Sequence, residues 1–398
     1  MIKSCIVSTT EIDDGEAAVR EITGQFASFP LQKNSIGLIM AHPEFINTGT
    51  YEKVAKAFSF PIIGMTTISQ FAGEAVGTYM LSVTVLTSDD CNFSCGLSEK
   101  IPSGDSCGVN DVSRAAYVAT RGRLEGDPKL ALLYGPFYDN PYLYHCIKAI
   151  TDASDGAVPL FGAAANDDHN TSLTNTGPRV LLNGEAYDDK FAIVLVSGAI
   201  EPKFYIASAT EESMVMPRVG VITKAENCRL LEINNAGTVD FLRSAGFPID
   251  ENNASGNSGL LSSIFVLHIN DGSYGVNVSR IPHSIVDGGI ICGGDLVEGA
   301  VLSIAFNTRE VVLETAKAAT DRINAGHCGG TAILHSCLGR RYGLLSEPQA
   351  EMELLRKTMG GRFNCTASYA NGELCPTGNN GGRADNRFHN QTLIACIF

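Results

Sequence analysis

The chain has 398 residues, of which 44% are hydrophobic and 18% charged, so we expect a globular protein with more than one domain and exclude overall disorder. Its 43 acidic residues outnumber its 29 Lys and Arg, which gives a net charge of −14, and it has no Lys/Arg-rich run. This balance argues against binding to nucleic acid or to an anionic membrane.

The N-terminal residues Met1–Ser8 form too short an apolar run for a signal peptide, and acidic residues follow at once. Elsewhere the sequence has no unbroken apolar stretch of about 18 residues, the length of a membrane span. We therefore expect a cytoplasmic protein whose 12 cysteines are thiols. Cys91 and Cys95 are the closest pair and no Cys-x-x-Cys motif occurs, so a zinc ribbon or a redox dithiol has little support.

The first half of the chain contains a repeat. Apolar spacing predicts, in chain order, a strand at 2–8, a helix at 15–26, a strand at 36–40 and a helix at 51–58. A strand with a glycine turn at 61–67 and two further strands at 79–86 and 92–97 follow. The same order returns at 112–123, 130–134, 141–151, 159–165, 191–196 and 203–209. We therefore predict an internal repeat of about 1–98 and 108–210, whose two halves leave a cleft lined by the turns at Gly64 and Gly162. Asn183-Gly184 predicts an additional hairpin in the second copy.

A second region begins near residue 213. It is predicted to hold mainly antiparallel strands at 217–223, 229–233, 264–269, 274–279 and 300–306, with helices at 239–245 and 308–323 and a polar surface loop at 250–259. A strand at 331–336, a helix at 348–359 and two closing strands at 363–370 and 393–398 follow. Thr308 is the expected N-cap of its helix. The predicted fold class is α/β (α+β): a duplicated α/β half at 1–212 with helix-covered sheets, and a mainly antiparallel α+β domain at 213–398.

Reactive side chains gather in the last sixty residues. Cys337 ends a predicted strand close to Arg340, and a guanidinium lowers the pKa of a thiol, so Cys337 is a candidate nucleophile; simple packing is the alternative. Glu373 and His389 are a candidate acid/base pair oriented by Tyr369 or Asn390, unless Glu373 only serves a turn. Residues 338–390 contain seven basic and five acidic side chains, which favours a small anionic or zwitterionic ligand.

The glycine turns supply further candidates. Asn166 and Asp167 follow the second turn and continue into Asp168 and His169, a run that offers amides and carboxylates; a metal site is possible in principle, but a solvated turn is the ordinary explanation. Thr66 and Thr67 occupy the matching place after the first turn and offer hydroxyl groups.

Several of these blocks together resemble the FIST family, a bacterial and archaeal sensory module with an N-terminal and a C-terminal part. The resemblance rests on 61–67, 161–168, 180–185 and 191–198 in the first part, and on 298–299, 336–340, 369–373 and 389–392 in the second. The chain departs from the family pattern at Ser69-Gln70, where a Gly-acid pair is usual, and at Asn166, where glycine is common.

The resemblance implies sensing rather than catalysis. FIST modules are proposed to bind small ligands, amino acids being favoured, and since the two parts use up this chain, the output is expected to be a separate protein such as a histidine kinase, a cyclase or a chemotaxis protein. Two alternatives stay open. One is a haem-binding nitric-oxide sensor that regulates a partner histidine kinase, and the other is a hydrolase or transferase that uses Cys337. We predict no cofactor unless the haem alternative holds.

The expected ligand site lies where the glycine turns meet the Cys337–Arg340 and Glu373–His389 segments. In this hypothesis Arg340 binds a ligand carboxylate and Glu373 binds an ammonium group. The predicted site residues are Thr66, Thr67, Asn166, Asp167, Cys337, Arg340, Tyr369, Glu373, His389 and Asn390.

Overall fold

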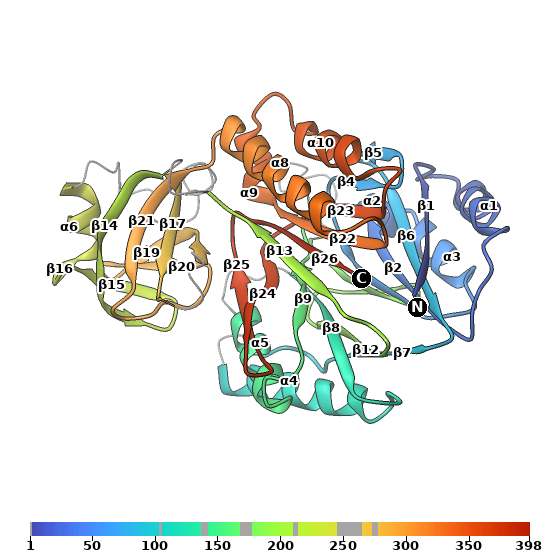
Figure 1. Ribbon diagram of the computed structural model, residues 1–398, viewed down its shortest axis with the longest axis horizontal. Helices are drawn as coiled ribbons and strands as arrows, with labels where there is room; N and C mark the ends of the chain where they lie inside the picture. Colours follow the sequence, from blue (N-terminus) through green and yellow to red (C-terminus); the bar gives the residue numbers. More distant parts are fainter. Residues whose placement is uncertain are drawn as a thin grey trace.

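The computed structural model describes residues 2–102, 106–136, 142–167, 177–209, 214–244, 265–272 and 278–398. It is a mixed α/β structure with an antiparallel sheet in its C-terminal part, which confirms the predicted fold class. Figure 1 shows helices on the outside of three sheets, and a separate antiparallel sheet beside them. The predicted loop at 250–259 lies outside the described residues.

The three sheets come from three units with one element order. The first unit contains β1 (Lys3–Thr9), α1 (Gly15–Phe26), β2 (Asn34–Ala41), α2 (Glu44–Asn47), α3 (Thr50–Lys56), β3 (Ile62–Thr66), β4 (Gln70–Ala72), β5 (Ala75–Gly77) and β6 (Leu81–Ser88). The second contains β7 (Cys91–Leu97), α4 (Ser106–Arg121), β8 (Pro128–Gly135), α5 (Tyr142–Ala153), β9 (Leu160–Ala164), β10 (Val180–Leu182), β11 (Glu185–Tyr187) and β12 (Ala192–Gly198). The third contains β13 (Lys203–Ala207), α8 (Arg309–Gly326), β22 (Thr331–Cys337), α9 (Leu338–Gly343), α10 (Ala350–Met359), β23 (Asn364–Ala370), β24 (Glu373–Asn380), β25 (Arg383–His389) and β26 (Leu393–Ile397).

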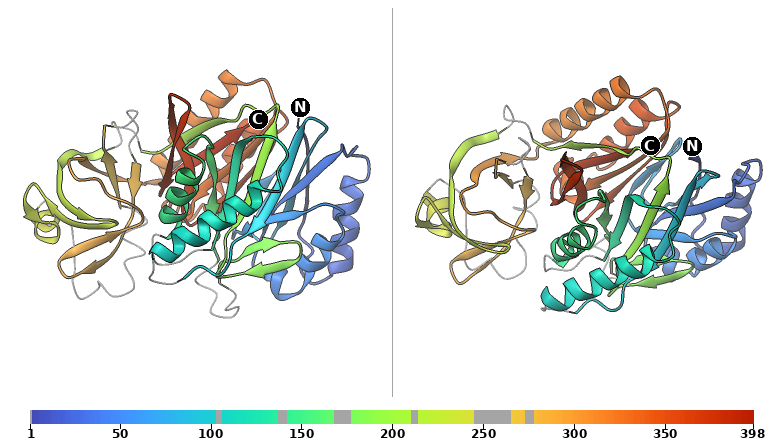
Figure 2. Two further views of the ribbon diagram at one scale, coloured as in Figure 1. Left: turned by 90° about the horizontal axis from the view of Figure 1, so that it is seen from below. Right: turned by 60° about the horizontal axis from the view of Figure 1, so that its bottom comes forward.

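An inserted sheet separates the first strand of the third unit from the rest of that unit. It is formed by β14 (Met214–Glu226), β15 (Arg229–Ile233), β16 (Ala236–Gly237), β17 (Phe265–Asn270), β18 (Val278–Arg280), β19 (Pro282–Val286), β20 (Gly289–Cys292) and β21 (Val301–Phe306), with helix α6 (Thr238–Ser244). All of its described pairings are antiparallel. Both views in Figure 2 show it beside the three units rather than among them.

The hairpin of each unit pairs with the sheet of another unit. The sheets run β1-β6-β2-β3-β10-β11, β7-β12-β8-β9-β24-β25 and β13-β26-β22-β23-β4-β5. The hairpin of the second unit therefore completes the first sheet, that of the third completes the second, and that of the first completes the third. This cyclic exchange joins the three units into one body, because no sheet is complete without a neighbour.

The pairing registers define equivalent positions. Within each sheet the third strand of the unit pairs in parallel with its neighbour and antiparallel with the borrowed hairpin, so Gly64 faces Leu181, Gly162 faces Leu374 and Ala367 faces Phe71. The first two units share one element order in which Gly64 and Gly162 are equivalent, but their bounds differ from the predicted 1–98 and 108–210, because β7 begins the second unit and β13 begins the third. The sequence reading missed the third unit, because the inserted sheet interrupts it and alanine replaces the glycine.

The predicted glycine turns are wrong. Gly64 and Gly162 lie inside β3 and β9, paired on both sides and buried, so they line no cleft. A Cβ atom at Gly64 would stand 1.7 Å from the carbonyl oxygen of Ile39, and one at Gly162 would stand 1.9 Å from that of Leu133. Glycine is therefore required at both positions for close strand pairing rather than for ligand access.

Hydrophobic clusters fill the spaces between these layers. One lies between the three sheets and includes Ile63, Tyr134, Phe161 and Ile394, and each unit has a further cluster between its sheet and its helices. The inserted sheet has a cluster of its own around Leu230 and Leu302. Helix α8 begins as predicted, because the Thr308 side chain accepts a hydrogen bond from Val311 N–H. None of the helices in the described ranges has both the length and the apolarity needed to cross a membrane.

Candidate functional site

The structure divides the predicted site residues among three places. Thr66, Thr67 and Asn166 lie at a ring of strand ends, where β3, β9 and β23 meet. Arg340 and Tyr369 lie near the buried Glu351. The remaining residues gather around the start of β24 and the end of β25: Cys337, Glu373, His389 and Asn390. Asp167 is half-buried next to the ring, and its neighbours Asp168 and His169 lie outside the described residues.

Hydrogen bonds link the strand ends of the ring from unit to unit. Asn166 N–H donates to Thr66 O (3.1 Å), and Asn371 N–H donates to Ala164 O (3.0 Å). These two residues follow equivalent strands, so each bond passes from one unit to the preceding one. The third link of this kind would join Ile68 N–H to Tyr369 O.

The Asn166 side chain makes that third link. Ile68 N–H donates to Asn166 Oδ1 (2.9 Å), while Asn166 Nδ2 donates to Tyr369 O (2.6 Å). The Thr67 hydroxyl also donates to Tyr369 O (2.9 Å), and Thr66 Oγ1 accepts from Arg179 N–H (2.9 Å). The polar groups of these three fully buried side chains are thus used to join the units. We therefore do not assign Thr66, Thr67 and Asn166 to the ligand site.

Arg340 is the cation of a fully buried ion pair. Its Nε and Nη2 donate to Glu351 Oε1 at 3.0 and 2.6 Å, and further bonds go to Thr315 Oγ1 (3.2 Å) and Val312 O (2.9 Å). Glu351 also accepts from the Ser336 hydroxyl (2.8 Å). Burial first, and then the charge of Glu351, raise the pKa of the Tyr369 phenol. The arrangement that was expected to present Arg340 to a ligand carboxylate instead directs it to a carboxylate of the protein.

Glu373 is a second buried glutamate, and it has no cation of this kind. It is fully buried at the start of β24, where Oε2 accepts from the Thr392 hydroxyl (2.8 Å) and from Thr392 N–H (3.4 Å). Oε1 has no hydrogen-bond donor among the described residues. Cys337 is held beside it, since Cys337 N–H donates to Thr392 O (2.9 Å).

Burial determines the protonation of this cluster. Desolvation raises the pKa of Glu373 to about 8. The hydrogen bonds with Thr392 and Cys337 and the charge of Arg340 lower this pKa and only partly offset the desolvation. The pKa of the Cys337 thiol is also raised, by burial and then by the neighbouring Glu373. At neutral pH both groups are therefore mainly protonated, so the cysteine is a thiol rather than a thiolate.

His389 stands directly across the hairpin from Glu373. The two residues are register partners in β24 and β25, so their side chains leave the same face of the hairpin. His389 Nε2 lies 3.0 Å from Cys375 O and donates to it, which leaves Nδ1 as an acceptor without a described donor. Burial lowers the pKa of His389 to about 4. The predicted Glu373 and His389 pair is thus brought together, and each side chain has one buried atom, Oε1 and Nδ1, without a described donor.

Equivalent positions in the other units give an internal control. Val180 and Gln70 begin the corresponding hairpins of the second and first units. Val180 is apolar, and Gln70 donates to Met40 O (3.1 Å) and Met80 O (2.7 Å) and accepts from the Ser82 hydroxyl. Only the third unit places an acid there, with one oxygen left without a donor. This fold position is therefore chemically specialised in the third unit.

The segment after β25 connects this cluster to the inserted sheet. Asn390 Oδ1 accepts from Ile281 N–H (3.3 Å), and Gln391 Oε1 accepts from the amide of Asn307, which follows β21. Phe388 O accepts from Arg280, which is ion-paired with Asp295. Consecutive residues thus contact Glu373 on one side and the inserted sheet on the other.

Sequence reasoning missed three residues of these clusters. Thr392 binds Glu373, Gln391 connects to the inserted sheet, and Glu351 neutralises Arg340. The His-Asn-Gln-Thr block was visible, but only its first two residues were chosen. Gln391 has a φ of 57° and lies over Gly339, whose added Cβ would stand 2.1 Å from Gln391 Nε2, so the two blocks fit each other. For Glu351 the only signal was its place on the buried face of a helix.

Comparisons with known proteins agree with the resemblance in the sequence. The model of the FIST N domain matches residues 35–236, and that of the FIST C domain matches residues 248–376. No protein with a curated description has a matching sequence.

Among solved structures, similarities are weak. A cyanuric acid hydrolase from A. caulinodans is 8% identical with a TM-score of 0.30, covering 52% of this chain and 72% of that one. A second cyanuric acid hydrolase, described as an evolutionary innovation by structural concatenation, is 9% identical with a TM-score of 0.33, covering 100% and 99%. PurLQS from Thermotoga maritima is 9% identical with a TM-score of 0.17, covering 100% and 72%. No functional argument rests on these scores.

Proposed function

Because the chain belongs to the FIST family, whose domains are sensory domains of signal transduction, we propose that it senses a small ligand through the buried acid Glu373. The ligand carries an ammonium group or another strong hydrogen-bond donor, and an amino acid or a similar small metabolite is the first class to test. The response passes to a separate signalling protein.

One observation carries this proposal. Glu373 is fully buried, and its Oε1 has no described donor, although an unmet buried polar group costs about 1–3 kcal/mol and a charged group more. In the first unit the fold satisfies an amide at the same position with three protein groups. A donor group on the ligand would supply the hydrogen bond that Glu373 Oε1 lacks, as groups of the protein do for the Gln70 side chain.

The electrostatics specify the preferred ligand. With a pKa of about 8, Glu373 is mainly protonated at neutral pH when no ligand is bound. A ligand cation would favour the carboxylate, so binding would release a proton and affinity would increase from pH 6 to pH 8. Since Arg340 is neutralised by Glu351, a carboxylate on the ligand would need a different partner.

The contacts of the 388–392 segment support a sensory role. Ligand binding at Glu373 would alter the hydrogen bonds to Thr392, and the residues just before Thr392 bind Ile281 and the Asn307 amide. We infer that the inserted sheet receives the change first, because these are its direct contacts with the cluster. The separate signalling protein would then respond to the changed position of the inserted sheet.

Thermal unfolding of the purified protein against a panel of the twenty amino acids, related carboxylates, short alkylamines and hemin tests the proposal. A ligand at about one hundred times its dissociation constant adds about 2.7 kcal/mol of stability, which is a shift of several degrees. We expect an amine-bearing compound to shift wild type and Glu353→Gln, an exposed control, but not Glu373→Gln. Equal shifts in Glu373→Gln would contradict the proposal.

The two alternatives have separate readouts. A haem sensor would give a Soret band with hemin. A Cys337 enzyme would need a reactive thiol, whereas burial and Glu373 raise the pKa of this one. We expect iodoacetamide to modify the exposed Cys107 and Cys328 well before Cys337.

A further inference from the structure

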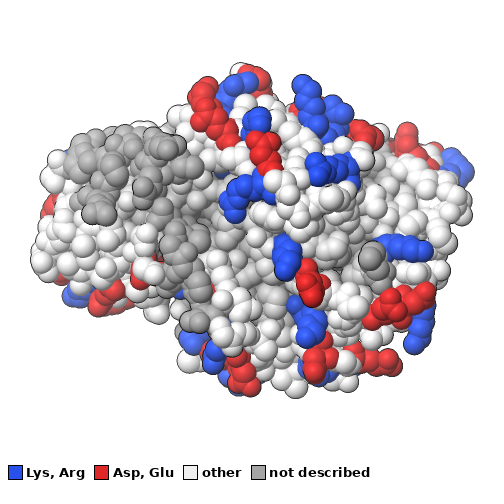
Figure 3. All heavy atoms as spheres, in the orientation of Figure 1, with Lys and Arg blue, Asp and Glu red and all other residues white. Residues whose placement is uncertain are grey.

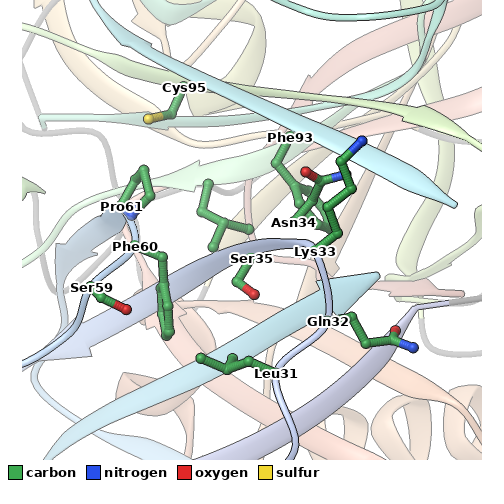
Figure 4. Close-up of a pocket in the computed structure, with 11 residues that line it drawn as sticks. Leu31, Gln32, Lys33, Asn34, Ser35, Ser59, Phe60, Pro61, Phe93 and Cys95 are labelled. Atoms are coloured by element: carbon green, nitrogen blue, oxygen red, sulfur yellow. The ribbon is translucent and has the colours of Figure 1, made fainter. Parts of the chain in front are cut away.

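A pocket of about 370 Å³ opens at the seam between the first and second units. Its walls come from residues 31–36 at the start of β2, from residues 59–61 before β3, and from Phe93 and Cys95 of β7 (Figure 4). The volume falls in the range of small-molecule sites, which is about 300–1,000 Å³. The seam pocket, as we call it, shares no residue with the Glu373 cluster.

The cyclic arrangement of the units explains why this seam is open. At the seam between the second and third units, Phe161 of β9 packs against Phe204 of β13, with ring centroids 6.3 Å apart. The registers make Ile63 equivalent to Phe161, and Cys95 equivalent to Phe204. In the first seam the smaller Cys95 thus lines the pocket at the position where Phe204 packs in the second, while Ile63 is buried in the core between the sheets.

The apolar side of the seam pocket is rigid. Phe60 belongs to a group of four phenylalanines, with its ring centroid 5.3 Å from that of Phe58 and 6.1 Å from that of Phe26. Phe29 completes the group through Phe26, at 5.9 Å. Such edge and tilted ring contacts fix the orientation of the Phe60 ring. A flat apolar ligand would therefore meet a preformed surface.

The polar side presents an acceptor. Asn34 uses both amide hydrogens on Cys91 O (3.0 Å) and Asn92 Oδ1 (2.9 Å), so the orientation of its amide is determined and Oδ1 accepts no hydrogen bond from the described residues. Gln32 Nε2 donates to Asp89 Oδ2 (3.1 Å), and Gln32 Oε1 is buried without a described donor. The Asn34 oxygen is thus left for a ligand that donates, whereas the Gln32 oxygen is buried away from the cavity, and Lys33 also lines the pocket.

We propose that the seam pocket is a second ligand site, which binds a small, flat molecule through Phe60 and Phe93 and receives its N–H or O–H donor at Asn34 Oδ1. The site is independent of the Glu373 cluster.

Benzamide is a suitable probe, and benzonitrile is its matched control, because the nitrile keeps the ring and lacks the donor. Saturation-transfer NMR and a structure with the probe bound would measure and locate binding. We expect benzamide to bind wild type, and benzonitrile to bind at least tenfold more weakly. In Cys95→Phe, which restores the side chain found in the second seam, benzamide affinity should fall at least tenfold.

Glu373→Gln should bind benzamide as wild type does, so the failure of the sensor proposal and of this one are distinguishable. If Cys95→Phe does not fold, Cys95→Leu tests the same filling with a smaller side chain. Absence of benzamide binding to folded wild type, binding located elsewhere, or undiminished binding in the filled variant would each overturn the seam-pocket site.

Discussion

Two fully buried glutamates of the third unit, Glu351 and Glu373, have opposite surroundings. Glu351 accepts two hydrogen bonds from Arg340 and one from Ser336, so its charge is matched inside the protein. Glu373 accepts from Thr392 and shares a hydrogen bond with the protonated Cys337 thiol, and its pKa is raised to about 8. Burial alone therefore does not distinguish the two acids, whereas among the described residues only Glu351 has an ion-pair partner.

Charge on the surface adds no comparable signal. On the face shown in Figure 3, Lys and Arg alternate with Asp and Glu, without a continuous area of either sign. Most ion pairs of the described residues are exposed, and such pairs contribute little to stability. The contrast between the two buried acids therefore provides the sharpest experiments.

The largest effect is expected from breaking the matched pair. Arg340→Met leaves Glu351 as an unpaired buried acid, so it should lower the free energy of unfolding by about 3–5 kcal/mol. Urea unfolding of this variant and of Arg340→Met/Glu351→Leu measures the change, and the double variant should recover most of the loss. If Arg340→Met kept its stability but abolished ligand binding, Arg340 would return to the ligand site.

Moving an acid to the first unit should be the next largest change. Gln70→Glu replaces the group that donates to Met40 O and Met80 O by an oxygen that faces the two carbonyls. We expect a loss of about 3 kcal/mol at pH 7, because two acceptors lose their donor and an acid is buried. Calorimetry against wild type measures it. Unchanged stability would show that this fold position tolerates an acid in any unit, and it would weaken the comparison.

Asn166 should have a smaller effect that is confined to the ring of strand ends. Asn166→Ala removes the side chain between Ile68 N–H and Tyr369 O and should cost about 2 kcal/mol. Asn371→Ala is the matched control, because the backbone link to Ala164 O remains and the side chain loses a single long hydrogen bond, to Ala165 O (3.3 Å). Equal losses in the two variants would contradict the structural role given to the Asn166 side chain.

Glu373 predicts a specific pH dependence. Its folded pKa of about 8 exceeds the ordinary value of 4.5, so the folded state holds a proton that the unfolded state releases. The contribution to stability is complete below about pH 4.5 and falls by about 1.4 kcal/mol per pH unit as pH rises towards 8. Urea unfolding at pH 5, 6.5 and 8 should show this slope in wild type and a shallower one in Glu373→Gln. Identical slopes would mean that Glu373 has an ordinary pKa.

Much of the fold was predictable from local pattern. Apolar spacing predicted most of the strands and helices of the first two units, and the matching segments 61–67 and 159–165 predicted that the units are related. The third unit was hidden because 101 residues separate the end of β13 at Ala207 from the start of α8 at Arg309. The borrowed hairpins were equally hidden, since strand exchange between units leaves no trace in the period of a sequence.

The residues of the candidate site were predictable from the sequence, but their interaction partners were not. Cys337, Glu373 and His389 were chosen as reactive residues and lie together. Arg340 was chosen for the same reason, yet its partner Glu351 is eleven residues away on another helix, and only the fold brings them into contact. Thr66 and Asn166 were chosen as polar residues after glycines, whereas the cyclic packing of the units gives them structural bonds.

Difference infrared spectroscopy of the Glu373 carboxyl tests the central claim most directly. The account predicts a protonated carboxyl band at pH 7 in wild type that is absent from Glu373→Gln, titrates near pH 8, and disappears when an amine-bearing ligand binds. A Glu373 that is already ionised at pH 7 without ligand, or whose band is unchanged by every ligand that stabilises the protein, would contradict it.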